Sequence, residues 1–278
     1  MKIEEIVRLA LREDLGDGDH TSLATIPAQA EGKAVLIAKD SGILAGNNVA
    51  REVFRQVDDS TKMKIFKNDG SDIKKGDEIF IVSGKAQSLL SAERTALNFL
   101  QRMSGIATFT SNLANQLVGL NTKLLDTRKT TACNRTVEKL AVKLGGGYNH
   151  RFGLYDMIMI KDNHIDFAGG IKSAINATHN YLNSKSKDLK IEIEVRNFNE
   201  LDEVLNVGMV NRIMLDNFSP EDLKKAINLI NNDYETEASG NISIENIRGY
   251  AETGVDYISV GALTHQIKSL DMSLKAVK

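Results

Sequence analysis

The sequence has 278 residues, enough for about two domains, and its 42% hydrophobic and 26% charged residues are typical of a folded globular protein with a sizeable core. Its 35 basic and 37 acidic residues leave a net charge of -2, which argues against nucleic acid or an anionic membrane as the main partner. Because it has one cysteine, no apolar run longer than 34–38 and no apolar signal-peptide segment near its first residues, we expect a cytoplasmic protein without a membrane span.

The first hundred residues mix helices and strands without a fixed rhythm. The patterns predict an amphipathic helix near the start, strands near 33–38, 62–66 and 78–82, and a helix near 47–56. A long helix over 88–103 carries its apolar residues on one face, and Gly105 breaks that pattern. We therefore expect an N-terminal α/β, sandwich-like domain over residues 1–105, and a C-terminal helix at about 266–278 could pack back on it.

After Gly105 short apolar strands alternate with helical stretches, which is typical of a parallel sheet. Strands are predicted at 123–128, 156–161, 190–195, 212–216, 236–239 and 257–261. Each of them ends in a charged, hydroxyl or glycine residue: Arg128, Lys161, Glu194, Asp216, Ser239 and Gly261. Barrels gather active-site groups from the ends of several strands, whereas an open doubly wound sheet gathers them at one switch point. The pattern thus favours a (β/α) barrel over residues 106–265.

Two loops near the C-terminus are rich in small residues. The loop 239–241 precedes a helix expected to begin near Ser243, and the loop 261–262 precedes one expected near Thr264. Backbone N–H groups at such helix N-termini bind phosphate groups. A phosphate site is therefore predicted after the last two strands.

The segment 123–164 is basic, with eight basic and four acidic residues and hence a local charge of +4 in a chain that carries −6 elsewhere. A positive patch in an acidic protein indicates a small polyanionic ligand, and the planar fork of arginine suits carboxylates and phosphates. Four of its cations lie at strand ends or beside a glycine run, so we assign them ligand contacts: Arg128, Lys129, Arg151 and Lys161.

Two other lysines of this segment are predicted to be structural. Lys139 and Lys143 have helical spacing and lie beside Glu138, so we expect them on a solvated helix face.

Two carboxylates, Glu194 and Asp216, end the strands that follow the basic segment. Facing the cations, they could stabilise a cationic transition state or hold a divalent metal. Glu192 lies one strand period from Glu194, so periodicity leaves the choice between them open, and Arg196 is a candidate partner of either. Lys161 could also serve as a Schiff-base lysine, which keeps an aldolase-type lyase as an alternative.

Six ordered motifs carry this chemistry: DTRKTT at 126–131, GGGYNHR at 145–151, IKDNH at 160–164, MLDN at 214–217, EASG at 237–240 and SVGALTH at 259–265. Two more stand in the N-terminal part, EDLGDGD at 13–19 and AERTALN at 92–98. Together they strongly resemble the quinolinate phosphoribosyltransferase family, the carboxylating nicotinate-nucleotide pyrophosphorylases. The resemblance covers nearly the whole chain.

The resemblance implies an N-terminal α/β domain followed by an incomplete, TIM-like (β/α) barrel, in a homodimer that shares its active sites. It implies a pentosyltransferase of NAD biosynthesis that uses Mg²⁺. Such an enzyme joins quinolinate to phosphoribosyl pyrophosphate (PRPP) and releases nicotinate mononucleotide, pyrophosphate and carbon dioxide. A same-fold enzyme for another pyridine-type acid, and a non-catalytic binding protein, remain alternatives.

The resemblance also implies roles for individual residues. Quinolinate would be held by Arg94, contributed by the second subunit, and by Thr127, Arg128, His150, Arg151 and Lys161. The phosphates of PRPP would lie against Lys129, Ser239, Gly240, Asn241, Gly261, Ala262 and His265. Catalysis would involve Lys129, Lys161, Glu194 and Asp216, with Glu194 rather than Glu192 matching the family and with the last two near the ribose hydroxyls and the metal.

Three departures from the family pattern stand out. Ala132 and Cys133 replace a usual Pro-Gly, which puts the backbone of that loop in question. Asn241 replaces a glycine and is one of the few residue types that tolerate positive φ. Arg196 replaces a common acidic residue. None of them removes a charged group from a proposed role.

Overall fold

The computed structural model describes residues 1–277, which form two compact units. Unit 1 gathers Met1–Ser111, Lys129–Gly146 and the C-terminal segment from Leu263. Unit 2 gathers Asn112–Arg128 and Gly147–Ala262. The prediction placed a single boundary after residue 105, whereas here two later segments return to unit 1. Within the described residues, no helix is long and apolar enough to cross a membrane.

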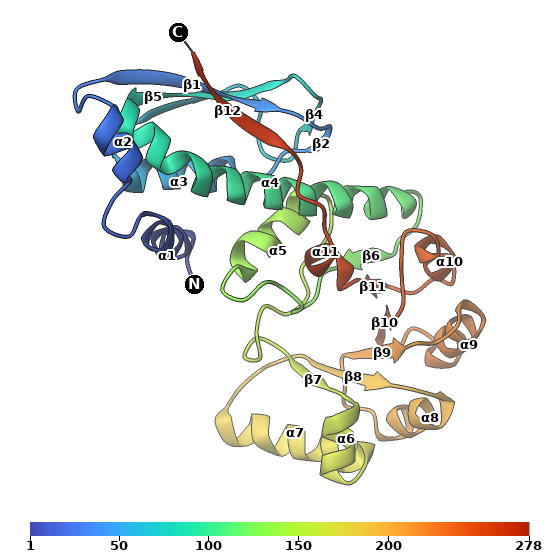
Figure 1. Cartoon of the computed structure of the whole chain (residues 1–278). Helices are drawn as coiled ribbons and strands as arrows, with labels where there is room; N and C mark the ends of the chain where they lie inside the picture. Colours follow the sequence, from blue (N-terminus) through green and yellow to red (C-terminus); the bar gives the residue numbers. More distant parts are fainter. Residues whose placement is uncertain (278) are drawn as a thin grey trace. The chain divides into compact units, whose positions relative to one another are not determined.

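Unit 1 is built on an antiparallel four-stranded sheet of order β12-β1-β5-β3 (Figure 1). Its strands are β1 (Glu31–Ala38), β3 (Lys62–Ile65), β5 (Glu78–Lys85) and β12 (Met272–Val277), and a small ladder joins β2 (Gly42–Ile43) to β4 (Asp72–Ile73). Its helices are α1 (Ile3–Leu15), α2 (His20–Thr25), α3 (Asn47–Val57), α5 (Arg135–Leu144), and most of α4 (Ala86–Gln116) and α11 (Ala262–His265). Helices α3 and α4 run along one face of the sheet, which gives the expected α/β layering.

The predicted C-terminal helix is wrong, because the segment forms strand β12. It pairs with β1 in antiparallel register, from Ala38 opposite Met272 to Lys33 opposite Val277. Without this strand, one edge of β1 would leave its backbone N–H and C=O groups unpaired. An extended segment can form hydrogen bonds with them, whereas the backbone groups of a helix are already paired within the helix.

The predicted end of the long helix at Gly105 is also wrong. Helix α4 continues through Gly105 to Gln116. A Cβ at position 105 would lie 2.4 Å from the carbonyl oxygen of Lys268. The glycine is therefore needed for close packing of the C-terminal segment against the helix, and it does not end the helix.

Unit 2 contains a parallel six-stranded sheet of order β6-β11-β10-β9-β8-β7. The strands are β6 (Lys123–Leu125), β7 (Ile158–Ile160), β8 (Ile191–Val195), β9 (Arg212–Asp216), β10 (Glu235–Ser239) and β11 (Tyr257–Ser259). Every strand lies beside its neighbour in the chain except β6 and β7, and β6 closes onto β11. This is the strand order of a (β/α) barrel with one gap, as expected.

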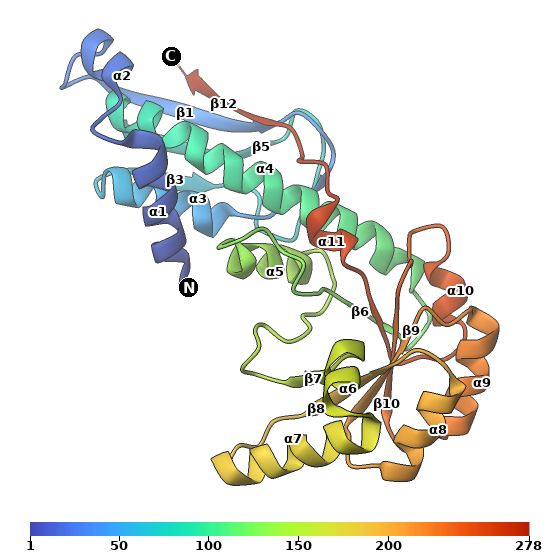
Figure 2. The same ribbon diagram turned by 60° about the horizontal axis from the view of Figure 1, so that its bottom comes forward.

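Helices α6 (Asp162–Ala168), α7 (Ile171–Lys185), α8 (Phe198–Val207), α9 (Pro220–Ile230) and α10 (Ile247–Ala251) complete unit 2. Helices α7 to α10 lie along the outer side of the strands (Figure 2). Helices α8 and α9 begin at N-cap residues, because the side chains of Asn197 and Ser219 accept N–H groups of the first turn.

Alternate residues of these strands differ sharply in chemistry. One set is apolar and fully buried, as at Ile193, Ile213 and Ile258. The other set is polar, and the register places Glu192 beside Arg212 and Asp216 beside Ser239. Since neighbouring residues of a parallel ladder point the same way, the charged side chains share the inner face of the partial barrel.

Candidate active site

The end of β7 brings Lys161 to Glu194. Ile160 pairs with Ile193, so the next residue of each strand continues the register, and Lys161 Nζ lies 2.6 Å from Glu194 Oε2. The carboxylate is nearly buried, whereas the lysine side chain is 44% exposed. A Schiff-base reaction would need this amine neutral and without such a partner, so the ion pair does not favour the aldolase-type alternative.

Asp216 joins Glu194 on the inner face. Glu194 pairs with Met214, two residues before Asp216, which makes the two carboxylates diagonal neighbours on adjacent strands. Asp216 accepts a hydrogen bond from its neighbour Asn217 at 2.7 Å and is half-buried. The structure thus brings together the two carboxylates that the strand-end pattern singled out.

Two guanidinium groups form the basic wall of unit 2. Arg128 follows β6, and its Nε is buried. Arg151 is held by a hydrogen bond from Nη1 to the Met157 carbonyl at 3.2 Å. Burial lowers the pKa of Arg151, and the positive charge of Arg128 lowers it further. Because like charges that lie close together repel, a bound anion would relieve this repulsion.

The ring of His150 lies among buried carboxylates. Its Nε2 is 3.0 Å from Glu192 Oε2 and 3.3 Å from Glu237 Oε2, and both carboxylates are fully buried. Arg212 Nη1 lies 3.1 Å from Glu237 Oε2. Burial lowers the pKa of His150, but the two glutamates outweigh burial and raise it to about 9.

The two glutamates differ from each other in their titration. Burial raises the pKa of Glu192 to about 7, and the charge of Glu237 adds to this. Burial also works against the charged form of Glu237, but the hydrogen bond from His150 holds its pKa below the ordinary value.

The loop 239–241 has a backbone that only small or amide residues favour. Gly240 has φ 94° and Asn241 has φ 50°. A Cβ at Gly240 would lie 2.2 Å from the Asn217 side-chain oxygen, and Asn241 Nδ2 donates to that oxygen at 3.1 Å. The loop therefore presents its backbone closely, as a phosphate site requires.

The expected helix start near Ser243 is wrong, because α10 begins at Ile247. The Asn246 side chain accepts the N–H of Ser243 at 2.8 Å and holds a turn in place of the first helical turn. The other loop agrees better with its prediction, since α11 begins at Ala262 directly after Gly261.

Three predicted site residues belong to unit 1. Arg94 is exposed on α4, Lys129 is exposed, and His265 is exposed at the end of α11. The Thr264 hydroxyl donates to the Lys129 carbonyl at 2.8 Å, so Lys129 and His265 come from segments that are hydrogen-bonded to each other. Thr127, half-buried, belongs to unit 2.

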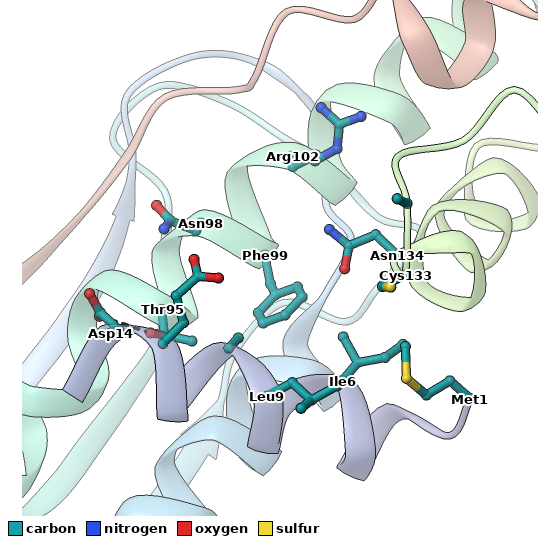
Figure 3. A pocket seen from close by; sticks show the side chains of 13 residues that line it. Met1, Ile6, Leu9, Asp14, Thr95, Asn98, Phe99, Arg102, Cys133 and Asn134 are labelled. Atoms are coloured by element: carbon teal, nitrogen blue, oxygen red, sulfur yellow. Dashed lines mark hydrogen bonds between the residues drawn. The ribbon is translucent and has the colours of Figure 1, made fainter. Parts of the chain in front are cut away.

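Unit 1 also contains a cavity of about 460 Å³ lined by α1, α4 and the loop 132–134 (Figure 3). Within it the Thr95 hydroxyl donates to Asp14 at 3.1 Å, and Arg102 donates to Glu138 at 2.7 Å. None of the residues predicted to bind substrate lines this cavity.

Comparison with known proteins assigns the family. The profile described as quinolinate phosphoribosyl transferase, C-terminal domain, matches residues 106–275, and that of the N-terminal domain matches residues 19–104. The chain belongs to the quinolinate phosphoribosyltransferase family.

Similar proteins span nearly the whole chain. A quinolinate phosphoribosyltransferase [decarboxylating] 1b of Nicotiana tabacum is 46% identical over 98% of this chain and 82% of its own. A probable nicotinate-nucleotide pyrophosphorylase [carboxylating] of Bacillus subtilis is 40% identical over 99% and 93%. The crystal structure of NadC from Streptococcus pyogenes has a TM-score of 0.92 and 40% identity, covering 99% of this chain and 97% of that one.

Two of the departures from the pattern of the quinolinate phosphoribosyltransferase family fall on residues with positive φ. Cys133 has φ 64°, and Asn241 has φ 50°. Both residues therefore adopt the left-handed region that glycine enters freely, at a cost of about 1–2 kcal/mol for a side chain such as that of cysteine.

The third departure, Arg196, does not pair with Glu192 or Glu194 as considered. Its guanidinium donates to Glu200 Oε1 at 2.6 and 2.8 Å and also reaches Asp166. Glu200 lies one helical turn further along the chain, within easy reach of the long side chain, whereas Glu192 and Glu194 point to the inner face.

The prediction that Lys139 is solvated is wrong. Lys139 is 1% exposed and Glu138 is fully buried, whereas Lys143 is exposed as expected. Glu138 accepts hydrogen bonds from Arg102 and from the Thr131 N–H, which draws this side of α5 into unit 1. Helical spacing alone does not reveal such buried partners.

Sequence reasoning missed Glu237 and Arg212, and treated Glu192 only as a competitor of Glu194. A signal was present, because all three are charged residues inside short apolar strands, where charges are rarely left without partners. Their positions along the strands place them on the inner face.

Proposed function

We propose that this chain is a decarboxylating quinolinate phosphoribosyltransferase, a nicotinate-nucleotide diphosphorylase (carboxylating) of NAD biosynthesis. It would transfer the phosphoribosyl group of PRPP to quinolinate and release nicotinate mononucleotide, pyrophosphate and carbon dioxide. The observation that carries the proposal is the pair of like-charged guanidiniums of Arg128 and Arg151 in one unit with the Lys161–Glu194 ion pair. Family membership and the names of the similar proteins support the same reaction.

Quinolinate would occupy the basic wall. A dicarboxylate offers one carboxylate to each of the two guanidinium groups, and charge-assisted hydrogen bonds contribute roughly 1.5–3 kcal/mol each. We assign its binding to Arg94 of a second copy of the chain and to Thr127, Arg128, His150, Arg151 and Lys161. This assignment implies a homodimer that shares its active sites, as the family resemblance does.

PRPP would bind through its phosphates. We assign the 5′-phosphate to the close backbone approaches at 239–241 and 261–262 with His265, and the pyrophosphate to Lys129. The positive φ values of Gly240 and Asn241 support this, since successive N–H groups in such turns form a concave anion site.

Glu194 and Asp216 would stabilise the positive charge that develops on the ribose as pyrophosphate leaves. Two carboxylates held on one face of a rigid sheet require little reorganisation when the charge forms. Lys161, bound to Glu194, would keep that carboxylate in place. Holding the two substrates in line supplies up to about 7–11 kcal/mol in ideal cases.

Decarboxylation needs no further group from the protein. Once the ring nitrogen carries the ribose, the ring is cationic. The C–C bond to the adjacent carboxylate then breaks, carbon dioxide leaves, and the electron pair stays on the ring carbon, stabilised by the neighbouring positive nitrogen, until a proton from solvent forms the C–H bond. The chain would contribute the cations that orient the two carboxylates of quinolinate. The product has one carboxylate fewer, so the same cations would bind it less tightly and release it.

Asp216, which is half-buried, and Glu194, which is nearly buried and paired with Lys161, offer the hard carboxylate oxygens that Mg²⁺ prefers, and the ion would keep several waters beside them. The closely spaced group His150, Glu192 and Glu237 fits it less well, because all three are buried and Arg212 already lies against the carboxylates. When bound, Mg²⁺ would neutralise charge on the leaving pyrophosphate. A cytoplasmic location remains a prediction.

The decisive experiment is release of carbon dioxide from carboxyl-labelled quinolinate by the purified protein with PRPP and Mg²⁺. We expect turnover with quinolinate and little with nicotinate, because a single carboxylate leaves part of the cationic wall unpaired. Asp216→Asn is the matched variant, expected to bind quinolinate but to turn it over about a hundredfold more slowly. No release from quinolinate by the unmodified protein would overturn the proposal, and a preference for another pyridine acid would identify a different member of the fold.

A further inference from the structure

A group of charged residues inside the partial barrel goes beyond the proposed substrate contacts. Glu192 and Glu237 are 0% exposed and Arg212 is 8% exposed. Arg212 donates to Glu237 at 3.1 Å, lies 3.9 Å from Glu192 and stacks on the Tyr257 ring at 3.9 Å. Removing each of these charges from water costs several kcal/mol, and apolar residues at the same positions would not have this cost. Stability alone therefore does not explain why the charges are there.

His150 connects this group to the predicted anion site. Its Nε2 faces both buried glutamates, while its Nδ1 accepts the N–H of Arg151 at 2.6 Å. The main-chain N–H of His150 donates to the side-chain Oδ1 of the buried Asp126 at 2.8 Å. The ring is therefore fixed on both sides, and its second contact is the main chain of an arginine in the basic wall.

The contacts of His150 also indicate where its hydrogen lies. Glu192 and Glu237 attract a proton to Nε2, and the Arg151 N–H leaves no room for a second proton on Nδ1. The carboxylates favour a doubly protonated ring, as the raised pKa of His150 reflects, but the close N–H opposes it. In this geometry the hydrogen is on Nε2.

Arg151 needs such support because it lies near a like charge. Arg128 repels it, Glu192 attracts it, and the Met157 carbonyl holds one end of the guanidinium. Asp156 attracts it as well, so the guanidinium lies between one like charge and two carboxylates, and a shift of its main chain would change that balance.

We propose that Glu192 and Glu237 are positioning residues for Arg151: they hold the His150 ring by Nε2, the ring holds the Arg151 main chain by Nδ1, and Arg151 thereby stays ready to bind a carboxylate. The proposal rests on the proposed function for the identity of that carboxylate ligand, quinolinate. Neither glutamate is assigned a substrate contact, and Arg212 lies against both carboxylates.

The chain offers a matched pair of variants to test this. Glu237 and Glu235 lie on the same face of β10 and both accept hydrogen bonds from Arg212, but only Glu237 reaches His150. We expect Glu237→Gln to raise the KM for quinolinate roughly tenfold, as loss of a charged hydrogen bond predicts, with kcat and the KM for PRPP within about twofold. Glu235→Gln should leave all three within about twofold.

Equal behaviour of the two variants, or a loss confined to kcat, would overturn the proposal. If Glu237→Gln fails to fold, Glu192→Gln takes its place with the same expected result. A readout independent of turnover uses protein labelled with ¹⁵N histidine: the His150 ring should show the Nε2–H tautomer, shifted in Glu237→Gln and unchanged in Glu235→Gln. An unchanged signal in Glu237→Gln would contradict the inference even if the protein did not use quinolinate.

Discussion

The two sheets of this protein bury opposite kinds of side chains. In unit 1, the register pairs Leu36 with Phe80 and Ala34 with Val82, all of them apolar and buried. In unit 2, the register pairs Glu192 with Arg212, and both of these charged residues are also buried. Burying apolar surface stabilises a fold by about 25 cal/mol per Å², whereas burying charges stabilises it little even when they are paired.

The difference shows that the side chains buried in unit 1 serve stability, whereas the charged side chains buried in unit 2 serve the chemistry of the site. A sheet that carries no ligand can bury apolar residues on its inner face. A barrel that must bind anions and stabilise a cation needs fixed charges, and these in turn need buried partners. Unit 2 can keep its charged interior because the outer layer, with Ile193, Ile213 and Ile258, supplies the apolar core.

The largest expected change in stability comes from removing Arg212, the cation that lies against the buried glutamates on the inner face of unit 2. Arg212→Met leaves Glu192 and Glu237 buried without it and should lower the free energy of unfolding by about 3–5 kcal/mol, measured by urea denaturation. Lys190→Met is the control, because Lys190 is exposed and, among the described residues, forms an ion pair with Glu235 alone, at 3.7 Å. Its effect should stay below about 0.5 kcal/mol. Similar losses from both variants would contradict the comparison.

In the apolar layer of the unit 1 sheet, a substitution that leaves a cavity should lower the free energy of unfolding. Leu36 is 0% exposed, so Leu36→Ala should lower the free energy of unfolding by about 3 kcal/mol while the folded enzyme keeps its kcat. Urea denaturation and turnover at low temperature check the two parts. A variant with normal stability would show that the layer repacks.

A third substitution should alter chemistry without altering stability. Asp216→Asn removes a half-buried carboxylate that accepts only an exposed local hydrogen bond among those described, and kcat should fall about a hundredfold. The midpoint of thermal unfolding should change little. A kcat within threefold of the unmodified protein would remove Asp216 from the mechanism.

A smaller gain in stability is expected at the loop before α5. Cys133→Gly relieves a left-handed backbone at φ 64° and should raise the free energy of unfolding by about 0.5–1 kcal/mol. The neighbouring Ala132→Gly is the control and should lower it, since that residue does not share the positive φ. Denaturation of both variants provides the measurement.

The smallest effect concerns a charge at the surface of unit 1, where charges cap helices. The Ser22 hydroxyl and N–H hold the pKa of Asp19 below its ordinary 3.8. A lowered pKa stabilises the fold above pH 4, and the stabilisation is lost as pH falls through the folded-state pKa. The stability difference between Asp19→Asn and the unmodified protein should therefore be present at pH 7 and should shrink at pH 3.

Several features could be predicted from the sequence because they depend on local pattern. The alternation of short apolar runs with helical stretches predicted all six strands of unit 2, although β6, β7 and β11 are shorter than expected. The residues at the strand ends include Lys161, Glu194 and Asp216. Positive φ at Asn241 followed from its residue type. The end of α4, the strand β12 and the burial of Lys139 did not follow, because each depends on a segment distant in the chain.

The sequence by itself determined the family, the alternating strands and helices, and the strand-end charges, since ordered motifs and hydrophobic periods are local properties. Only the tertiary structure decided that Gly105 packs against Lys268, that the C-terminal segment pairs with β1, and that His150 lies between Glu192 and Glu237. Those contacts join residues far apart in the chain. Their partners are selected by sheet register and by the burial cost of unpaired polar groups, which no local pattern contains.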